Sequence, residues 1–289
     1  MLKRLYKWAE NNYRISCVYH KLRLTLEARK PATPVIVYQM GKVGSTAIVE
    51  GLHNSSRNTP IFHVHFLAKP RIDDAYYRLR KLRTKFNANT WCLYESEFVR
   101  RYVIGAKNPS KIKLITLFRE PIARNISSFF YNIDKYVPAF NTFDIEDPIS
   151  IKKLEKLYLN NFVEHEYAIQ WFSDELEATF GINVFESKFN TQKGYVIIKD
   201  AHTEVLVIKL EKLKDCALNS IEEFLGIKDF TLHKANTSEE QPYNEFYKKF
   251  LKEAKLPVSY IDKMYSSQFM KHFYSTEEIN QFREKWIST

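Results

Sequence analysis

The chain has 289 residues, 45% of them hydrophobic and 15% aromatic, which allows a substantial buried core and argues against disorder. Its formal charge of +10 favours an anionic partner: a nucleotide, an acidic polysaccharide, a phospholipid surface or nucleic acid. Three widely spaced cysteines (Cys17, Cys92 and Cys216) indicate free thiols in a reducing compartment and show no metal-ligand spacing.

Residues 1–31 combine Leu and aromatic side chains at helical spacing with many Lys and Arg residues, which predicts a basic amphipathic extension. We expect this helix to pack on the domain, with peripheral contact to a membrane surface as the alternative. Pro31 and Pro34 then separate it from residues 32–289, which we expect to form a single domain.

The chain contains no apolar run long enough to span a bilayer, and its first four residues lack an apolar signal region. These two observations predict a soluble protein that is made and kept in the cytoplasm.

The stretch from Val35 to Thr46 carries the first indication of function. A β-branched run at 35–37 predicts a buried strand, two glycines with Lys42 between them follow, and residues 45–52 read as a helix. This arrangement turns several backbone N–H groups toward one point and adds the positive end of a helix dipole. We therefore expect an anion there, with an ordinary strand-to-helix turn as the structural alternative.

Further along the chain, strands and helices alternate, which predicts an α/β fold with a parallel sheet and right-handed crossovers. The expected strands cover residues 61–67, 112–118, 195–198 and 205–208, and the expected helices cover 76–86, 95–103, 121–130, 150–160, 161–179, 218–225 and most of the last forty residues. Irregular segments are expected at 132–148, which we expect to cover the acceptor site, and at 231–244. Ligands of parallel sheets bind beyond the carboxyl ends of the strands, so the glycine loop and Arg119 can share one site.

Two motifs at these strand ends resemble those of a known family. Residues 42–46, Lys-Val-Gly-Ser-Thr, resemble the 5′-phosphosulfate loop of sulfotransferases that use 3′-phosphoadenosine 5′-phosphosulfate (PAPS). They depart from the nucleoside-triphosphatase loop, where Lys follows the last glycine. Arg119-Glu120-Pro121, with Arg124 and Ser127 after it, resembles the 3′-phosphate-binding motif of the same sulfotransferases. Taken by itself, this second motif leaves an alternative open, in which Arg119 pairs with Glu120 and Ser127 is solvated.

Taken together, the two motifs resemble those of the PAPS-dependent carbohydrate sulfotransferases, especially bacterial sulfotransferase-like proteins assigned to capsular polysaccharide synthesis, and the resemblance extends weakly into the C-terminal half. The resemblance implies a P-loop-like three-layer fold, in which helices flank a central parallel sheet. It also implies transfer of a sulfuryl group from PAPS to a carbohydrate hydroxyl by in-line displacement, with no metal and no nucleic-acid partner. The residues it assigns to the 5′-phosphosulfate are Gly41, Lys42, Val43, Gly44, Ser45 and Thr46, and those it assigns to the 3′-phosphate are Arg119 and Ser127.

The reaction needs a base near the acceptor hydroxyl and a cation near the leaving oxygen, and Lys42 is the candidate cation. His63 stands where relatives often carry a catalytic Glu, and His65 lies two residues on, on the same face of the expected strand. His63 is our first candidate for the base and His65 the second. Glu95 and Glu97 are the weaker alternatives.

Two other function classes remain open. One is an ATP-dependent phosphotransferase of P-loop fold, which would use magnesium. The other is a non-catalytic module that binds an anionic polymer at a basic surface. Against the first stand the position of Lys42 and the absence of an evident acidic metal ligand after a strand.

Overall fold

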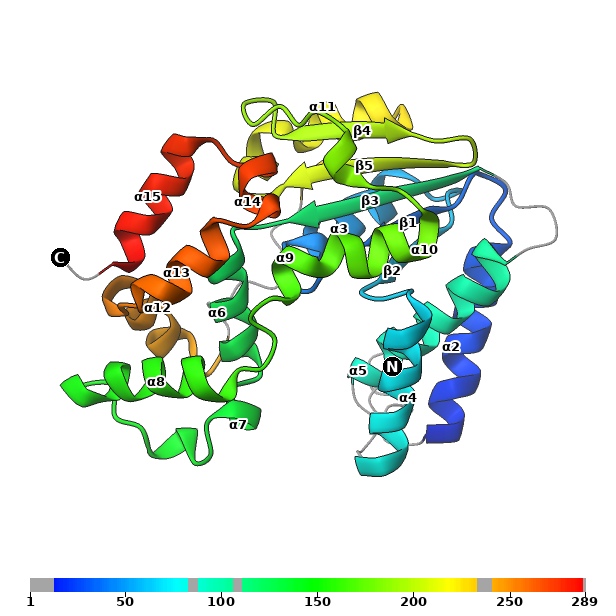
Figure 1. Ribbon diagram of the computed structural model, residues 1–289. Coiled ribbons are helices and arrows are strands. Elements are labelled where there is room, and N and C mark those ends of the chain that lie inside the picture. The colour runs from blue at the N-terminus through cyan, green and yellow to red at the C-terminus, as the bar shows by residue number, and fades with distance from the viewer. Residues whose placement is uncertain (1–12, 83–87, 106–110, 233–240, 288–289) are drawn as a thin grey trace.

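The computed structural model describes residues 13–82, 88–105, 111–232 and 241–287 of the chain. Five strands form one mostly parallel sheet that is flanked by helices, a mixed α/β architecture (Figure 1). The strands are β1 (Val35–Tyr38), β2 (Ile61–Val64), β3 (Ile112–Phe118), β4 (Tyr195–Lys199) and β5 (Thr203–Lys209). The helices are α2 (Tyr13–Ala28), α3 (Ser45–Ser55), α4 (Lys69–Leu82), α5 (Ala88–Phe98), α6 (Pro121–Tyr131), α7 (Ile133–Tyr136), α8 (Pro148–Asn161), α9 (Tyr167–Trp171), α10 (Ala178–Phe180), α11 (Leu213–Leu225), α12 (Asn244–Glu253), α13 (Val258–Tyr265), α14 (Gln268–Phe273) and α15 (Thr276–Trp286). Two π-helical turns, η1 (Val99–Ile104) and η3 (Phe172–Glu177), continue α5 and α9.

The strand order is β2-β1-β3-β5-β4. β1 pairs in parallel with both β2 and β3, and β3 pairs in parallel with β5. β4 runs antiparallel to β5, so the expectation of a wholly parallel sheet is wrong at this edge. The reason is the connection: only residues 200–202 separate the two strands, and a parallel pair needs a crossover of a dozen residues or more.

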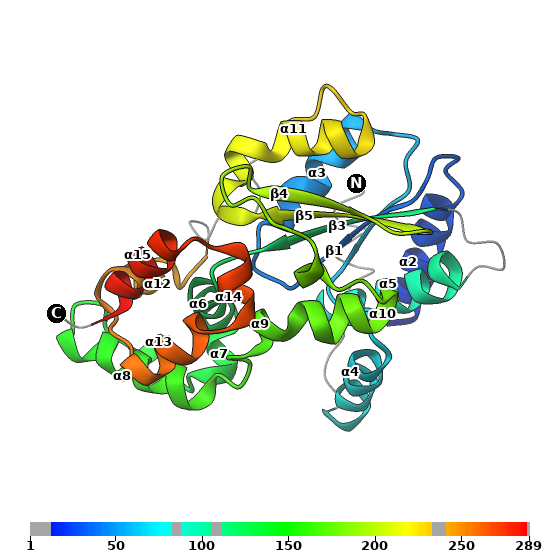
Figure 2. The ribbon, with the colours of Figure 1, turned by 45° about the horizontal axis from the view of Figure 1, so that its top comes forward.

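Helices cover both faces of this sheet. α3 and α11 lie on one face, and the segment from α9 to α10 lies with α14 on the other (Figure 2). Every side chain of β1 is buried, as expected for a strand packed on both sides. On the second face Tyr38 packs edge-on against Trp171, and Phe118 packs against Phe273.

The parallel strands end on the side of the sheet where α6, α8, α12 and α13 form a helical block (Figures 1 and 2). α6 begins with Pro121 at its first turn, and the Glu120 carboxylate caps it by accepting the N–H groups of Ile122 and Ala123. Arg119 therefore directly follows the end of β3, Glu120 caps α6, and Pro121 is the first residue of α6. This order places Arg119 at the edge where ligands of such sheets bind.

Several predicted boundaries shift. β2 ends at Val64, so His65 lies just beyond the strand, and α4 starts at Lys69 rather than at residue 76. The segment 132–148 contains the short helix α7 and a 3₁₀ turn at Phe140–Thr142. Residues 1–12 of the predicted extension, 83–86 of the predicted basic helix and 233–240 of the predicted polar loop lie outside the described residues. None of the helices within the described ranges is both long and apolar enough to cross a bilayer.

Candidate functional site

The loop between β1 and α3 has a backbone that only particular residues accept. Gly44 caps α3 with a φ of 80°, and a Cβ there would lie 2.7 Å from Leu210 Cδ1. Lys42 also has a positive φ, 74°, which is rare and strained for a residue with a side chain. The first N–H groups of α3 have no partner within the helix, so the loop presents donors together with the positive end of the α3 dipole.

The two motifs meet at this loop. Arg119 Nη1 lies 3.5 Å from the carbonyl oxygen of Lys42, and Arg124 Nε donates to the carbonyl oxygen of Gly41 at 3.0 Å. They meet because β1 and β3 are hydrogen-bonded neighbours whose carboxyl ends lie side by side. Ser127 follows Arg124 by three residues on α6, so it lies one turn further along the same face, and it is partly buried.

Arg124 is a buried guanidinium, 3% exposed, without an acidic partner. Its hydrogen bonds go to the Gly41 carbonyl and to Asn125 Oδ1, and among the described residues no carboxylate forms an ion pair with it. Burial lowers the pKa of Arg124, but a guanidinium stays protonated, so the charge remains. Glu164 attracts Arg124 electrostatically without forming an ion pair, and a buried guanidinium without a directly bonded carboxylate favours binding of an anion from solution.

Lys42 adds a second cation without an acidic partner in the described part of the chain. Its ammonium lies 2.9 Å from the centre of the Tyr131 ring. Burial, and then repulsion from Arg124, lower the pKa of Lys42 from 10.5 to about 7. The side chain is therefore close to Arg124, and an anion placed between them would relieve the repulsion.

The two candidate histidines lie together beside the loop, with ring centres 4.9 Å apart. His63 Nε2 lies 2.9 Å from the Gln39 side-chain nitrogen and 3.0 Å from Ser45 Oγ, so its lone pair faces two donors. His65 Nδ1 donates to the backbone carbonyl of Gln39 at 3.1 Å, which fixes the tautomer and leaves the lone pair on Nε2. The Nε2 atom of His65 makes no hydrogen bond to any described residue.

Burial favours the neutral form of both histidines. Burial lowers the pKa of His63 to about 3, with a further contribution from His65. Burial also lowers the pKa of His65, the bond to the Gln39 carbonyl raises it, and the charges of Lys42 and Arg124 lower it. His65 is thus within electrostatic reach of both cations at the loop.

The two glutamate candidates for the base are engaged elsewhere. Glu95 accepts the backbone N–H of His63 at 3.0 Å through Oε1 and pairs with Arg23 at 3.0 Å through Oε2. It thereby ties α5 and α2 to β2. Glu97 accepts a short hydrogen bond from the Tyr76 hydroxyl.

A second set of contacts holds the loop that follows His65. The Glu175 carboxylate, on η3, accepts the backbone N–H groups of Leu67 at 2.7 Å and Ala68 at 2.9 Å. Arg100, on η1, donates to the Leu67 carbonyl at 2.7 Å. π-Helical turns occur frequently at functional sites, and here two of them, remote in sequence, fix the same short connection.

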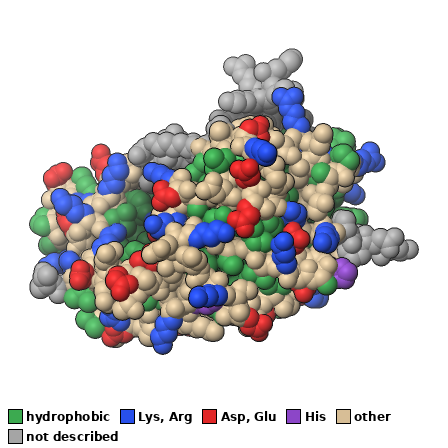
Figure 3. Space-filling model, turned by 90° about the horizontal axis from the view of Figure 1, so that it is seen from above, with side chains coloured by type: hydrophobic (Ala, Val, Ile, Leu, Met, Phe, Trp, Pro, Cys, Tyr) green, Lys and Arg blue, Asp and Glu red, His purple; other side chains and the backbone are tan. Residues whose placement is uncertain are grey.

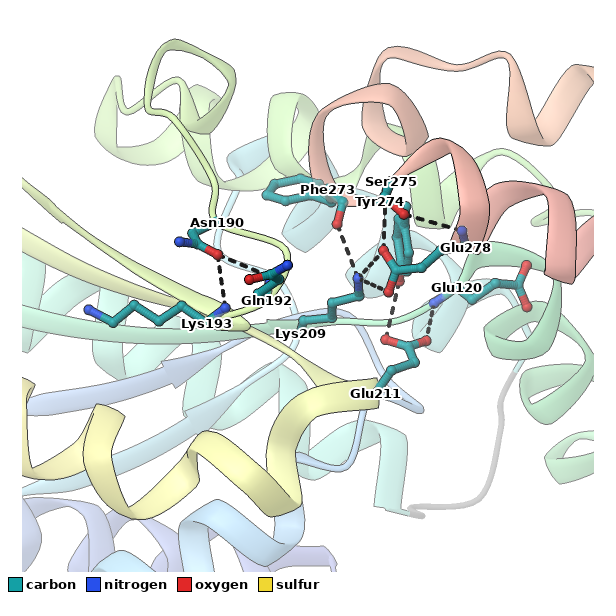
Figure 4. A network of polar contacts seen from close by, with 10 residues as sticks. All are labelled: Glu120, Asn190, Gln192, Lys193, Lys209, Glu211, Phe273, Tyr274, Ser275 and Glu278. Carbon is teal, nitrogen blue, oxygen red and sulfur yellow. Dashed lines mark hydrogen bonds and ion pairs between the residues drawn. The ribbon is translucent and has the colours of Figure 1, made fainter.

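On the other side of the site, a buried polar network attaches the C-terminal helices to the turn after β3 (Figure 4). Lys209, fully buried, pairs with Glu278 at 2.6 Å. Glu211 accepts the backbone N–H of Glu120 at 2.8 Å and the Tyr274 hydroxyl at 3.3 Å. These contacts fix the position of Glu120, and with it the direction in which Arg119 leaves the strand.

The structure therefore brings together most of the residues predicted for the site: Gly41, Lys42, Val43, Gly44, Ser45, Thr46, His63, His65 and Arg119. Val43 is an exception in one respect, because its side chain is buried in the core and only its backbone can serve a ligand. Sequence reasoning assigned no role to Gln39, Arg124 or Tyr131. Arg124 was signalled by its spacing from Arg119, but nothing local marks the other two.

The described residues contain no group of three or more His, Cys, Asp or Glu side chains arranged to hold a metal ion. Residues 142–275 match the family model NKWYS, described as "Putative capsular polysaccharide synthesis protein". The matched segment contains Glu175, Lys209 and Glu211 but neither the glycine loop nor Arg119. Neither a curated protein nor a solved structure matches the chain. Over residues 142–275 the chain is thus similar to a family whose description connects it with capsular polysaccharide synthesis.

Proposed function

We propose that the protein transfers a sulfuryl group from PAPS to a hydroxyl of a capsular or cell-surface carbohydrate or its precursor. The observation that carries this proposal is the convergence of Lys42, Arg119 and Arg124 on one glycine loop, where none of the three forms an ion pair with a carboxylate of the described residues. A donor with phosphate groups at both the 5′ and 3′ positions suits such a site better than a single phosphate, because the cations come from two strand ends.

In this proposal the α3 N-terminus, Lys42 and Ser45 bind the 5′-phosphosulfate, and Arg119 with Ser127 binds the 3′-phosphate. Arg124 lies beneath the loop, hydrogen-bonded to Gly41, and its charge acts on the same group. Fork-shaped guanidinium groups and helix N-termini are the donors that proteins use most effectively for phosphate. Lys42 stabilises the negative charge that grows on the bridging phosphate oxygen as the sulfur–oxygen bond breaks.

The geometry favours His65 over His63 as the base. The Gln39 carbonyl orients the His65 ring and leaves Nε2 unbonded among the described residues, whereas His63 Nε2 already faces Ser45 and Gln39. The acceptor oxygen attacks sulfur, its proton passes to His65 Nε2, and 3′,5′-bisphosphoadenosine leaves. Negative charge on the bound donor offsets the effect of Lys42 and Arg124, so it raises the pKa of His65 toward the range in which a base is effective.

The identity of the acceptor as a carbohydrate is supported by the description of the family that residues 142–275 match. Part of that segment follows α7 and lies in the helical block beyond the carboxyl ends of the strands, on the side where the glycine loop opens (Figure 1). We therefore propose that this block contributes to the acceptor site.

The decisive test is a calorimetric titration with 3′,5′-bisphosphoadenosine and, in parallel, with 5′-AMP, which lacks the 3′-phosphate. Wild-type protein should bind the bisphosphate more tightly than 5′-AMP. In Arg119→Met the ratio of the two dissociation constants should fall by at least about tenfold, which corresponds to the loss of one charge-assisted hydrogen bond. The matched control is Lys111→Met, because Lys111 precedes β3 and Arg119 follows it, at opposite ends of one strand. If wild-type protein does not distinguish the two ligands, the proposal is wrong.

A second experiment separates binding from chemistry. His65→Gln should abolish sulfuryl transfer and leave the affinity for bisphosphoadenosine within about threefold of wild type. His63→Gln should instead weaken nucleotide binding, since His63 supports Ser45 in the loop. Normal turnover by His65→Gln would rule out His65 as the base.

The same titration separates the other function classes. A phosphotransferase would bind ATP with magnesium in preference to bisphosphoadenosine, and a polyanion-binding module would bind neither nucleotide specifically. On the face of the molecule shown in Figure 3, Lys and Arg side chains are interspersed with Asp and Glu, so a continuous basic surface for a polymer is not present on that face.

A further inference from the structure

Among its described side chains, helix α2 packs against the domain through one face. Leu24 is buried on that face, Arg23 pairs with Glu95 of α5, and Glu27 accepts the backbone N–H of Ile61 at 2.8 Å. The last contact covers part of the free edge of β2, which is the outermost strand on this side. α2 is therefore firmly attached, and it lies at the margin of the molecule in both ribbon views (Figures 1 and 2).

The opposite face of α2 carries an exposed apolar stripe. Val18, Leu22 and Leu26 follow one another at intervals of four residues and are 68%, 58% and 55% exposed. Side chains at this spacing lie on the same face of a helix. Other exposed large hydrophobic residues, such as Ile149 and Val258, belong to different helices and do not form such a row. An exposed apolar row of this kind is typical of a surface that contacts a membrane or another protein.

From residue 18 to residue 30, the exposed charged side chains are basic. Lys21 and Arg29 are exposed next to the stripe, whereas Glu27, the one acidic residue of α2, is paired with Lys30 at 2.7 Å. A partner of this face must therefore offer apolar groups to the stripe and negative charges to the basic side chains beside it.

We propose that α2 binds, in the plane of the interface, to the surface of a membrane that contains anionic phospholipids. Its apolar stripe enters the boundary between headgroups and acyl chains, and Lys21 and Arg29 contact the phosphates. A second copy of the chain fits less well, because a two-fold pairing of this face would bring the same positive charges together. The proposal does not depend on the nucleotide site and goes beyond the proposed transferase activity.

The test is co-sedimentation of the full-length protein with vesicles of phosphatidylcholine alone and of phosphatidylcholine with phosphatidylserine. We expect binding to the anionic vesicles, and we expect the double variant Leu22→Ser/Leu26→Ser to weaken it by about tenfold or more. The matched control is Ile149→Ser/Val258→Ser, which removes two similarly exposed apolar side chains from other helices without changing the charge. This control should bind as wild type does.

Four results would overturn the proposal. These are no vesicle binding by the wild-type protein, equal binding to both kinds of vesicle, unchanged binding by Leu22→Ser/Leu26→Ser, and dissociation of an oligomer by that double variant in size-exclusion chromatography with light scattering. Thermal melting tests whether the double variants are folded. The affinity of the α2 variant for bisphosphoadenosine is measured as well, because a failure of the membrane proposal should leave that affinity unchanged.

Discussion

If the protein binds a nucleotide as proposed, the lowered pKa of Lys42 should make that binding dependent on pH. Burial and Arg124 lower this pKa from 10.5 to about 7, so the side chain is mostly neutral at pH values above that. A bound phosphate replaces repulsion by attraction and returns the pKa toward its ordinary range. If the bound value is near 10, binding at about pH 8 takes up about 0.9 proton per nucleotide.

The affinity should follow the same protonation. Each pH unit above 7 costs about 1.4 kcal/mol to charge Lys42, so the dissociation constant of bisphosphoadenosine should rise about tenfold per unit between about pH 7.5 and 9. Calorimetry in buffers of different ionisation enthalpy measures the proton uptake directly. The phosphates of the ligand titrate below this range, burial lowers the pKa values of His63 and His65, and the thiols of Cys92 and Cys216 have pKa values raised to about 11, so these groups do not contribute.

The matched variant is Lys42→Gln, which removes the titrating group. It should bind more weakly and lose the pH dependence. An affinity that stays constant between about pH 7.5 and 9, with uptake below about 0.2 proton in wild type, would refute the assignment of Lys42 as the buried cation of the site.

The same lowered pKa affects folding in the absence of ligand. The unfolded chain holds the proton up to about pH 10.5 and the folded chain only up to about 7, so the folding cost is complete below pH 7 and disappears as the pH rises toward 10.5. The difference between these values sets an upper limit of about 5 kcal/mol, which the partial solvent contact and the Tyr131 ring reduce. Lys42→Gln should therefore stabilise the ligand-free protein below pH 7, as chemical denaturation can show.

Two further predictions concern the structures that hold the loop and the turn after β3. Gly44→Ala combines a positive φ with a Cβ 2.7 Å from Leu210 Cδ1, so it should lower the free energy of unfolding by about 2 kcal/mol in chemical denaturation. The control is Gly41→Ala, whose Cβ would meet no atom within 4 Å and which should change the free energy of unfolding by less than about 0.5 kcal/mol. Equal effects of the two substitutions would contradict the packing seen around the loop. Lys209→Met leaves the carboxylate of Glu278 unpaired and should lower the free energy of unfolding by about 2 to 3 kcal/mol. The double variant Lys209→Met/Glu278→Gln should regain at least about 1 kcal/mol of that free energy, because a Gln side chain can still accept the backbone N–H at the start of α15. A double variant no more stable than the single variant would contradict the pairing.

Much of the architecture follows from patterns that are local in the sequence. The β-branched residues of β1, the apolar run of β3, Pro121 at the start of α6 and Gly226 at the end of α11 each predict an element that the structure contains. Gly44, which accepts the positive φ before α3, and Glu120, which caps α6, are local signals of the same kind. They act through one strand or one helix end, so neighbouring residues are sufficient to specify them.

The positions of the glycine loop and the Arg119 turn relative to each other could be expected from the sequence only in general terms. Parallel strands end on one side of a sheet, which predicts that the glycine loop and Arg119 share an edge. That they are direct neighbours depends on the strand order, in which β3 lies beside β1. The antiparallel direction of β4 could have been read from the three residues that connect it to β5, but the strand pattern alone does not contain it.

The chemistry of the site was decided by tertiary contacts. Which histidine keeps a free lone pair depends on Gln39 and Ser45, and the pKa of Lys42 depends on burial and on Arg124. Likewise, the exposed stripe on α2 exists because the helix packs against the domain through its other face. Hydrogen bonds, charges and burial of this kind join residues that are far apart in the chain. The sequence by itself therefore determined the elements and the candidate residues, while their protonation, orientation and exposure were decided only when the chain folded.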